Sequence, residues 1–215
     1  MEPARLLHTA LTQESASDRL QAALTAGTHP SDEYVTVLVE RSGVELDFFV
    51  RDMLTWALVR HPSELTVPLL LQEVTEGGDQ ARSQSLHTLS KIGDPRGWSV
   101  ITPALLKDPN EEVARSAWRT AVVLVPEGED AALAETLVTQ LGRGDRAVQL
   151  SLSRALAALG DAARSALEGL STRGTPAKRA HALATEKLLD DPDASFDGIL
   201  HEAIRTVSLA DDPTA

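Results

Sequence analysis

The side chains that could do chemistry in this chain are few and scattered. Six histidines lie at positions 8, 29, 61, 87, 181 and 201, and no two of them share the i, i+4 spacing of zinc ligands on one helix. There is no cysteine, which excludes disulfides, thiolate metal sites and a cysteine nucleophile. The GxxxxGK[ST] and GxGxxG phosphate loops, the GxSxG elbow and the HExxH motif are all absent. We therefore expect a protein that is not an enzyme and that uses no metal or other cofactor.

Basic and aromatic residues, in contrast, recur at regular positions. An apolar-then-polar pair of residues returns with a period of about 32, at Val50-Arg51, Ala81-Arg82, Val113-Ala114, Val148-Gln149 and Lys178-Arg179. The residues four and eight positions after the start of each pair are mostly leucine or small, which is the core spacing of a helix. The residues six positions after it lie on the opposite side, and they are Trp56, His87, Arg119, Arg154 and Ala184.

This outward column and its neighbours predict a surface that binds a partner. We expect a protein or peptide with an acidic segment to bind there, because arginine suits carboxylates and because Trp and Arg dominate interface hot spots. The predicted binding residues are Trp56, Arg60, His87, Lys91, Arg115, Arg119, Arg154 and His181. The alternative is that the Lys and Arg residues among them bind no partner and only form a solvated helix face. A structural role is expected instead for Arg51, Arg82 and Arg179, paired with loop carboxylates such as Asp94 or Asp108, and for Trp98 and Trp118, which should pack in the interior.

Glycine and proline divide the chain into the helices that would position these residues. Gly93 is expected to end one helix in the left-handed conformation, and Pro95 to lie in the first turn of the next. Outer helices are predicted at 31–42, 64–76, 95–107, 129–142 and 161–171. Inner helices, which carry the column, are predicted at 46–60, 79–92, 110–125, 145–159 and 175–189.

The two ends of the chain have a different pattern from the repeats at 31–190. Residues 1–30 contain two short helical segments between 3 and 27 that would cap the first repeat, which has no neighbour to cover it. Residues 191–215 contain a closing helix at about 196–209, followed by a tail at 210–215 that is expected to fray. We expect one domain over 1–215.

Composition and charge support a helical protein with one basic surface. Hydrophobic residues make up 42% of the chain but aromatic residues only 3%, and strand-like alternation is almost absent, so an all-α fold is expected. The net charge is −12, which argues against nucleic acid or acidic membranes as partners. The predicted inner helices nevertheless hold 11 Lys or Arg and 7 Asp or Glu, whereas the remainder holds 9 and 25. The sequence shows no membrane span and no signal peptide, so a cytoplasmic protein is expected.

A family resemblance is carried by two segments, GDPRGW…LLKDPNEEVARSAW and GDRAVQLSLSRALAALGD. They resemble the short bacterial HEAT repeats, also called PBS-lyase HEAT-like repeats, in which the pattern GDPxAVPxLxxLLxDPxxxVRxxAAxAL recurs. The resemblance covers about residues 31–190. It implies a right-handed α-α superhelix of about five helix pairs, whose second helices line a concave binding side, and a non-enzymatic adaptor or scaffold.

Enzymes that share this repeat provide alternatives. Deoxyhypusine hydroxylase binds two irons through several His-Glu dipeptides, and only His201-Glu202 occurs here, so that activity is excluded. The resemblance to phycobilin lyases is to the scaffold alone. A nucleic-acid-binding protein related in fold to the alkylpurine DNA glycosylases is the remaining alternative, since Trp56, Trp118 and several arginines lie on the inner helices.

Overall fold

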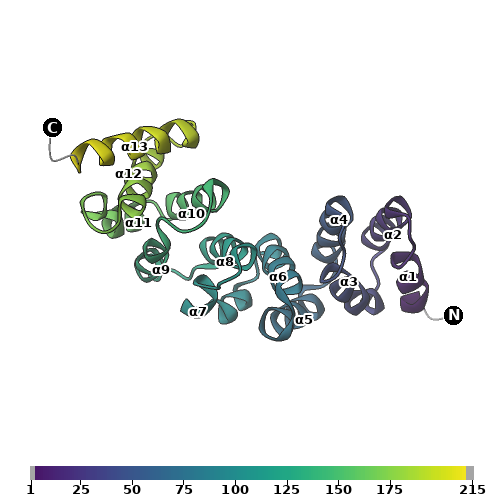
Figure 1. Cartoon of the computed structure of the whole chain (residues 1–215). Helices are drawn as coiled ribbons and strands as arrows, with labels where there is room; N and C mark the ends of the chain where they lie inside the picture. Colours follow the sequence, from purple (N-terminus) through teal and green to yellow (C-terminus); the bar gives the residue numbers. More distant parts are fainter. Residues whose placement is uncertain (1–2, 212–215) are drawn as a thin grey trace. The chain divides into compact units, whose positions relative to one another are not determined.

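The computed structural model describes residues 3–211, and within that range all regular structure is helical, as predicted (Figure 1). The helices form two compact units. The first contains the described residues up to Leu105 together with Glu112–Leu124, and the second contains Leu106–Glu111 and the described residues from Val125 onward. None of the helices within residues 3–211 combines the length and the apolar composition that crossing a membrane requires.

The first unit consists of consecutive helix pairs, of which α3 with α4 and α5 with α6 are neighbours in Figure 1. Its α-helices are α1 (Pro3–Leu11), α2 (Ala16–Thr28), α3 (Val35–Ser42), α4 (Phe48–Val59), α5 (Ser63–Glu76), α6 (Asp79–Ile92) and, apart from their residues Leu106 and Glu111, α7 (Pro103–Leu106) and α8 (Glu111–Leu124). Two short 3-10 helices, η1 (Asp32–Tyr34) and η2 (Pro95–Val100), precede α3 and α7.

The second unit has the same alternation of short and long helices. It contains α9 (Asp130–Leu137), η3 (Val138–Gln140), α10 (Arg146–Ala158), α11 (Asp161–Leu167), η4 (Leu170–Thr172), α12 (Pro176–Asp190) and α13 (Phe196–Ala210). The closing helix α13 packs on α12 through Phe196, Leu200, Ala203 and Val207. Helices α1 and α2 lie in the range predicted for the capping segments, and α13 lies in the range predicted for the closing helix. Residues 212–215 of the expected frayed tail lie outside the described residues.

The inner helices match their predicted ranges to within two residues, because their ends are determined locally. Asp47 and Asp145 accept hydrogen bonds from backbone N–H groups at the starts of α4 and α10, and Thr175 does the same for α12. Gly93, with φ of 71°, ends α6 in the left-handed conformation as predicted.

The outer helices are more broken than predicted. The helix expected at 95–107 is the 3-10 helix η2 followed by the short α7, because Pro103 disfavours helical geometry at Thr102. The helix expected at 161–171 ends at Leu167, and Gly169 then has φ of 73°. Only the range 64–76 forms an outer helix of nearly the predicted length.

The core is the predicted stripe of leucine and small residues. Leu54, Leu89, Ala117 and Leu156 are each fully buried, and so is Trp118, as expected for a packing residue. Side chains of this size allow neighbouring helices to approach closely. Helices α4, α6, α8 and α10 thus use one face for the core and leave the opposite face for solvent. In α12 the predicted outward residue Ala184 is buried as well, because it packs in the cluster formed with α13.

Candidate partner-binding surface

Helices α4, α6 and α8 of the first unit are held side by side by polar contacts between their flanks. The Nε2 atom of Gln84 donates to Oγ1 of Thr55 at 2.8 Å, which joins α6 to α4. The hydroxyls of Ser83 and Ser116 are 2.9 Å apart, which joins α6 to α8. Such contacts fix the register of the three helices, so the side chains on their exposed faces form one surface.

His87 lies at the centre of this surface. Burial lowers its pKa, the positive charges of Lys91 and Arg119 lower it further, and the carboxylate of Asp52 partly opposes them. These influences come from α4, α6 and α8, which places the four side chains around a common region. At neutral pH the His87 imidazole is therefore uncharged, and the positive charge of the region is supplied by Lys91 and Arg119.

Two arginines on α8 extend the positive charge. Nη1 of Arg115 donates to Oε1 of Glu112 at 2.7 Å, while its Nε is buried and has no partner among the described residues. Nη2 of Arg119 donates to the hydroxyl of Ser116 at 3.1 Å. The Arg119 side chain is exposed, but neighbouring residues desolvate it in part, which lowers its pKa; the charge of Arg115 lowers the pKa further and that of Glu112 raises it. We call His87, Lys91, Arg115 and Arg119 the basic face.

Trp56 and Arg60 have a structural function in addition to the predicted one. The Trp56 ring packs so closely on α2 that a methyl group added at Gly27 would lie 2.3 Å from it. The Arg60 guanidinium lies 4.8 Å from the centroid of that ring, and its Nε donates to the Gly27 carbonyl at 2.7 Å. Trp56 is still 36% exposed, so one side of it borders the surface.

His181 is the predicted binding residue that the structure contradicts, because its side chain is completely buried. Its Nδ1 accepts from the backbone N–H of Gly142 at 2.9 Å, so Nε2 carries the proton. That proton faces the hydroxyl of Ser153 at 3.0 Å and the Gln149 carbonyl at 3.1 Å. Because the protonated Nε2 has no free lone pair, His181 cannot accept a proton from the Ser153 hydroxyl and so cannot activate it as a nucleophile.

The prediction for His181 was wrong because a helix that follows later in the chain packs over its side chain. The ring of Phe196 at the start of α13 lies 6.2 Å from that of His181 in an edge-on arrangement, so the closing helix covers this position. Burial lowers the pKa of His181 to about 4, opposed only in part by the Gln149 carbonyl. Arg154 is exposed on α10, which belongs to the second unit and not to the unit that contains the basic face.

The three predicted structural arginines bind backbone carbonyls, and two of them also pair with carboxylates, Arg82 with Asp79 at 3.7 Å and Arg179 with Asp211 at 2.6 Å. Nη1 of Arg51 donates to the Leu46 carbonyl at 2.7 Å, and Nε of Arg82 donates to the Val74 carbonyl at 3.3 Å. Nε of Arg179 donates to a carbonyl in η4 in the same way. Each therefore binds backbone in the preceding segment. Asp94 pairs instead with Arg96 at 2.7 Å.

Glu45, whose function the sequence did not indicate, is the centre of a buried ion cluster before α4. Its side chain is fully buried, and it accepts from Arg19 at 2.8 Å, from Arg41 at 2.6 Å and from the Asp47 backbone N–H at 2.9 Å. Burial alone would raise the pKa of Glu45, but the hydrogen bonds from Arg19, the Asp47 backbone and Arg41 outweigh it and lower the pKa to about 2. The loop is therefore firmly fixed.

Four large apolar side chains point away from this fixed loop and the first turn of α4. The exposed fractions are 63% for Val44, 84% for Leu46, 65% for Phe48 and 69% for Phe49. We call these residues the apolar edge. These residues were not among the predicted binding residues, which were chosen by the helix period alone. The Asp47 N-cap, which places both phenylalanines in the first turn of α4, is the local signal that could have indicated them.

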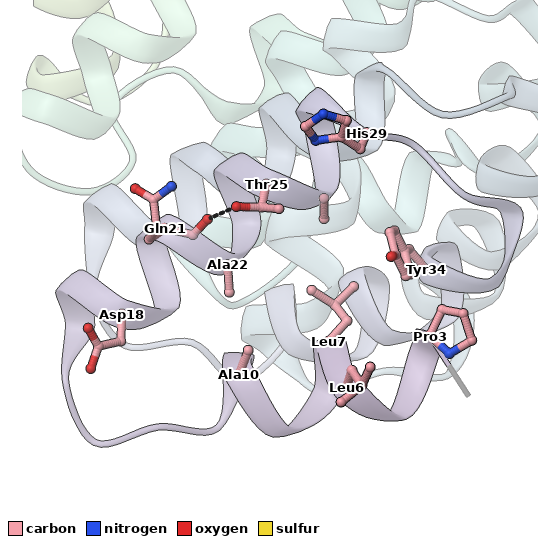
Figure 2. A pocket seen from close by; sticks show the side chains of 11 residues that line it. Pro3, Leu6, Leu7, Ala10, Asp18, Gln21, Ala22, Thr25, His29 and Tyr34 are labelled. Atoms are coloured by element: carbon pink, nitrogen blue, oxygen red, sulfur yellow. Dashed lines mark hydrogen bonds between the residues drawn. The ribbon is translucent and has the colours of Figure 1, made fainter. Parts of the chain in front are cut away.

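A separate hollow lies between α1 and α2 (Figure 2). Its volume is about 460 Å³, and Leu6, Leu7 and Ala10 of α1 face Ala22 of α2 across it. The Thr25 hydroxyl at its border is used within α2, where it donates to the Gln21 carbonyl at 2.8 Å. The hollow can hold apolar side chains, and it brings together no catalytic set of charged groups. Among residues 3–211, no three His, Asp or Glu side chains are grouped as a metal site requires.

Comparisons with known proteins support the fold alone. No protein-family model and no curated protein matches the chain. Two crystal structures of engineered proteins from the Northeast Structural Genomics Consortium are similar to it. One is 17% identical, with a TM-score of 0.50, and the match covers 97% of this chain and 100% of that one. The other is 21% identical, with a TM-score of 0.49 and coverage of 97% and 98%.

Proposed function

We propose that this protein is a non-enzymatic adaptor of the HEAT-repeat type that binds an acidic segment of a protein partner on the basic face. The observation that carries the proposal is the grouping of His87, Lys91, Arg115 and Arg119 around one exposed region of α4, α6 and α8. In a chain of net charge −12, a local group of cations attracts the carboxylates of a partner, whereas the acidic remainder of the surface repels them and so directs them to this region.

The chemistry of the basic face suits a carboxylate better than it suits catalysis. Lys91 and Arg119 are exposed, and the hydrogen bond of Arg119 to the Ser116 hydroxyl occupies only its Nη2 among the described residues. Guanidinium groups with free donors bind carboxylates through short, charge-assisted hydrogen bonds. The neutral His87 between them adds a hydrogen-bonding group without a competing charge.

The proposal is tested by affinity capture with a charge-reversed variant. We expect Lys91→Glu with Arg119→Glu to lose a partner that the wild type retains, while the helical circular dichroism stays unchanged because both side chains are exposed. The matched control is Lys107→Glu with Arg205→Glu, two exposed cations outside the basic face whose reversal changes the net charge equally. Equal loss in both variants, or no loss in either, would contradict the proposal.

A further inference from the structure

The apolar edge is unusual because the whole chain contains few aromatic residues and two of them are exposed together here. It contains two of the three phenylalanines of the chain. The rings of Phe48 and Phe49 are 5.6 Å apart with planes at 78°, an edge-to-face pair that holds both in position. Large exposed apolar groups gathered in one place commonly mark a binding surface.

The backbone beneath the apolar edge is ordered before any ligand arrives. Besides the Glu45 carboxylate, the Glu45 carbonyl is fixed, because it accepts from Gln80 at 2.7 Å and from Arg51 at 3.0 Å. A partner that covers Leu46 and the phenylalanines therefore does not have to immobilise the loop. Preorganisation of this kind increases affinity by reducing the entropy lost on binding.

The apolar edge and the basic face belong to one continuous surface. Phe49 and Trp56 are seven residues apart on α4, which is two helical turns, and Met53 lies between them on the same side. Asp52, whose charge acts on His87, is also in this stretch. Two interhelix spacings, roughly 20 Å in all, separate the α4 side chains from those of α8.

We propose that the apolar edge and the basic face bind a single short segment of the partner, which carries large apolar residues followed or preceded by acidic residues. The apolar side chains cover Leu46, Phe48 and Phe49, and the carboxylates contact Lys91, Arg115 and Arg119. An extended segment of about six residues spans the distance. This inference rests on the proposed function and adds the apolar half of the ligand.

A second copy of this chain is a poorer occupant. A fully exposed large apolar side chain has an accessible surface area on the order of 200 Å², so the exposed area of the four residues of the apolar edge is roughly 500 Å² in total. A stable interface needs about 800 Å² on each partner. Two copies would also each bring a net charge of −12. The size of the apolar edge instead matches a few side chains of a short segment.

Random-peptide display on the full-length chain tests the inference. We would select peptides of about 12 residues, long enough to span both regions, on the wild type, on Phe48→Ser with Phe49→Ser, and on Lys91→Glu with Arg119→Glu. The wild type should enrich peptides with both large apolar and acidic residues. The phenylalanine variant should enrich acidic peptides without the apolar residues, and the charge variant should lose the acidic preference. A fluorescent peptide selected on the wild type should bind the phenylalanine variant at least about tenfold more weakly.

The control variant is Ile204→Ser with Leu209→Ser, which removes apolar side chains of 50% and 56% exposure from α13. It should bind the selected peptide like the wild type. Acidic peptides without apolar residues from the wild type would overturn this inference and leave the proposed function standing. Apolar peptides without acidic residues, basic peptides or no enrichment would overturn both. A dimer in sedimentation that the phenylalanine variant dissociates would identify a second copy as the occupant and overturn the inference.

Discussion

At the scale of single residues, the carboxylate of Glu45 is the group on which the loop before α4 depends most. Replacing it by glutamine leaves Arg19 and Arg41 without their anion in a buried place, and we expect a loss of about 3–5 kcal/mol in the free energy of unfolding. Urea denaturation measures it. The control Glu40→Gln, on the exposed side of α3, should change stability by less than about 0.5 kcal/mol. Equal effects of the two changes would show that the ion cluster does not hold the loop.

The low pKa of Glu45 also predicts how this contribution depends on pH. Because its pKa falls from 4.5 to about 2 on folding, the stabilisation is complete above pH 4.5 and disappears as the pH falls toward 2. The Glu45→Gln variant should therefore approach the wild type in stability under strongly acidic conditions. A difference that stays constant from neutral pH to about pH 2 would contradict the assignment.

His181 predicts a second pH dependence, in a milder range. Its pKa is about 4 in the folded protein and 6.5 ordinarily, so the unfolded chain takes up the proton first as the pH falls. Stability present above pH 6.5 is lost progressively toward pH 4, with about 2 kcal/mol lost at pH 5. Comparing wild type with His181→Asn at about pH 7.5 and about pH 5 isolates this contribution. The exposed His201→Asn should retain the wild-type pH dependence; if His181→Asn retains it too, the burial of His181 is not its cause.

At the scale of helices, the close approach of α2 and α4 depends on Gly27. A methyl group there would lie 2.3 Å from the Trp56 ring and 2.9 Å from the Cα atom of Ala57. We expect Gly27→Ala to destabilise the protein by about 1–3 kcal/mol, as overpacking does. The same change at Gly198, an open position in α13, should stabilise by about 0.5–1 kcal/mol because alanine favours a helix. Denaturation curves with the same sign for both glycines would refute the close contact.

Helix ends and core faces could be predicted from sequence because their causes are local. Gly93, Asp47 and the leucine stripe act through the residues next to them, and the inner helices follow the prediction closely. The environment of His181 could not be predicted in this way, because Phe196 covers it from a different helix.

Of the candidate site, the part that depends on local pattern could be predicted from the sequence, and the part that depends on long-range contacts could not. The basic face follows from helix period, so its residues on α6 and α8 could be named before the structure. The apolar edge depends on a buried ion pair between Glu45 and Arg19, which are 26 residues apart. Long-range pairs of this kind leave no periodic pattern in the sequence.

At the scale of the whole molecule, charge separates the proposed partner from nucleic acid. The chain carries 32 acidic and 20 basic residues. Binding to DNA needs many Lys and Arg side chains together, because they neutralise the phosphates and release the counterions bound to the DNA. We expect no binding of duplex DNA at about 50 mM salt, where such contacts are strongest. A fluorescence titration measures this, with a second one at about 200 mM salt. Tight binding that weakens steeply with salt would favour the glycosylase-related alternative.

The central claim is that the exposed face of α4, α6 and α8 binds the partner through an acidic segment. Photo-crosslinking in the native cell tests it most directly, with benzoylphenylalanine placed at Lys91 in one variant and at Lys107 in the other. We expect a crosslinked partner from the first variant alone, and mass spectrometry should find the crosslink in a segment rich in Asp and Glu. A crosslink from Lys107 alone, or a crosslinked segment without acidic residues, would contradict the account.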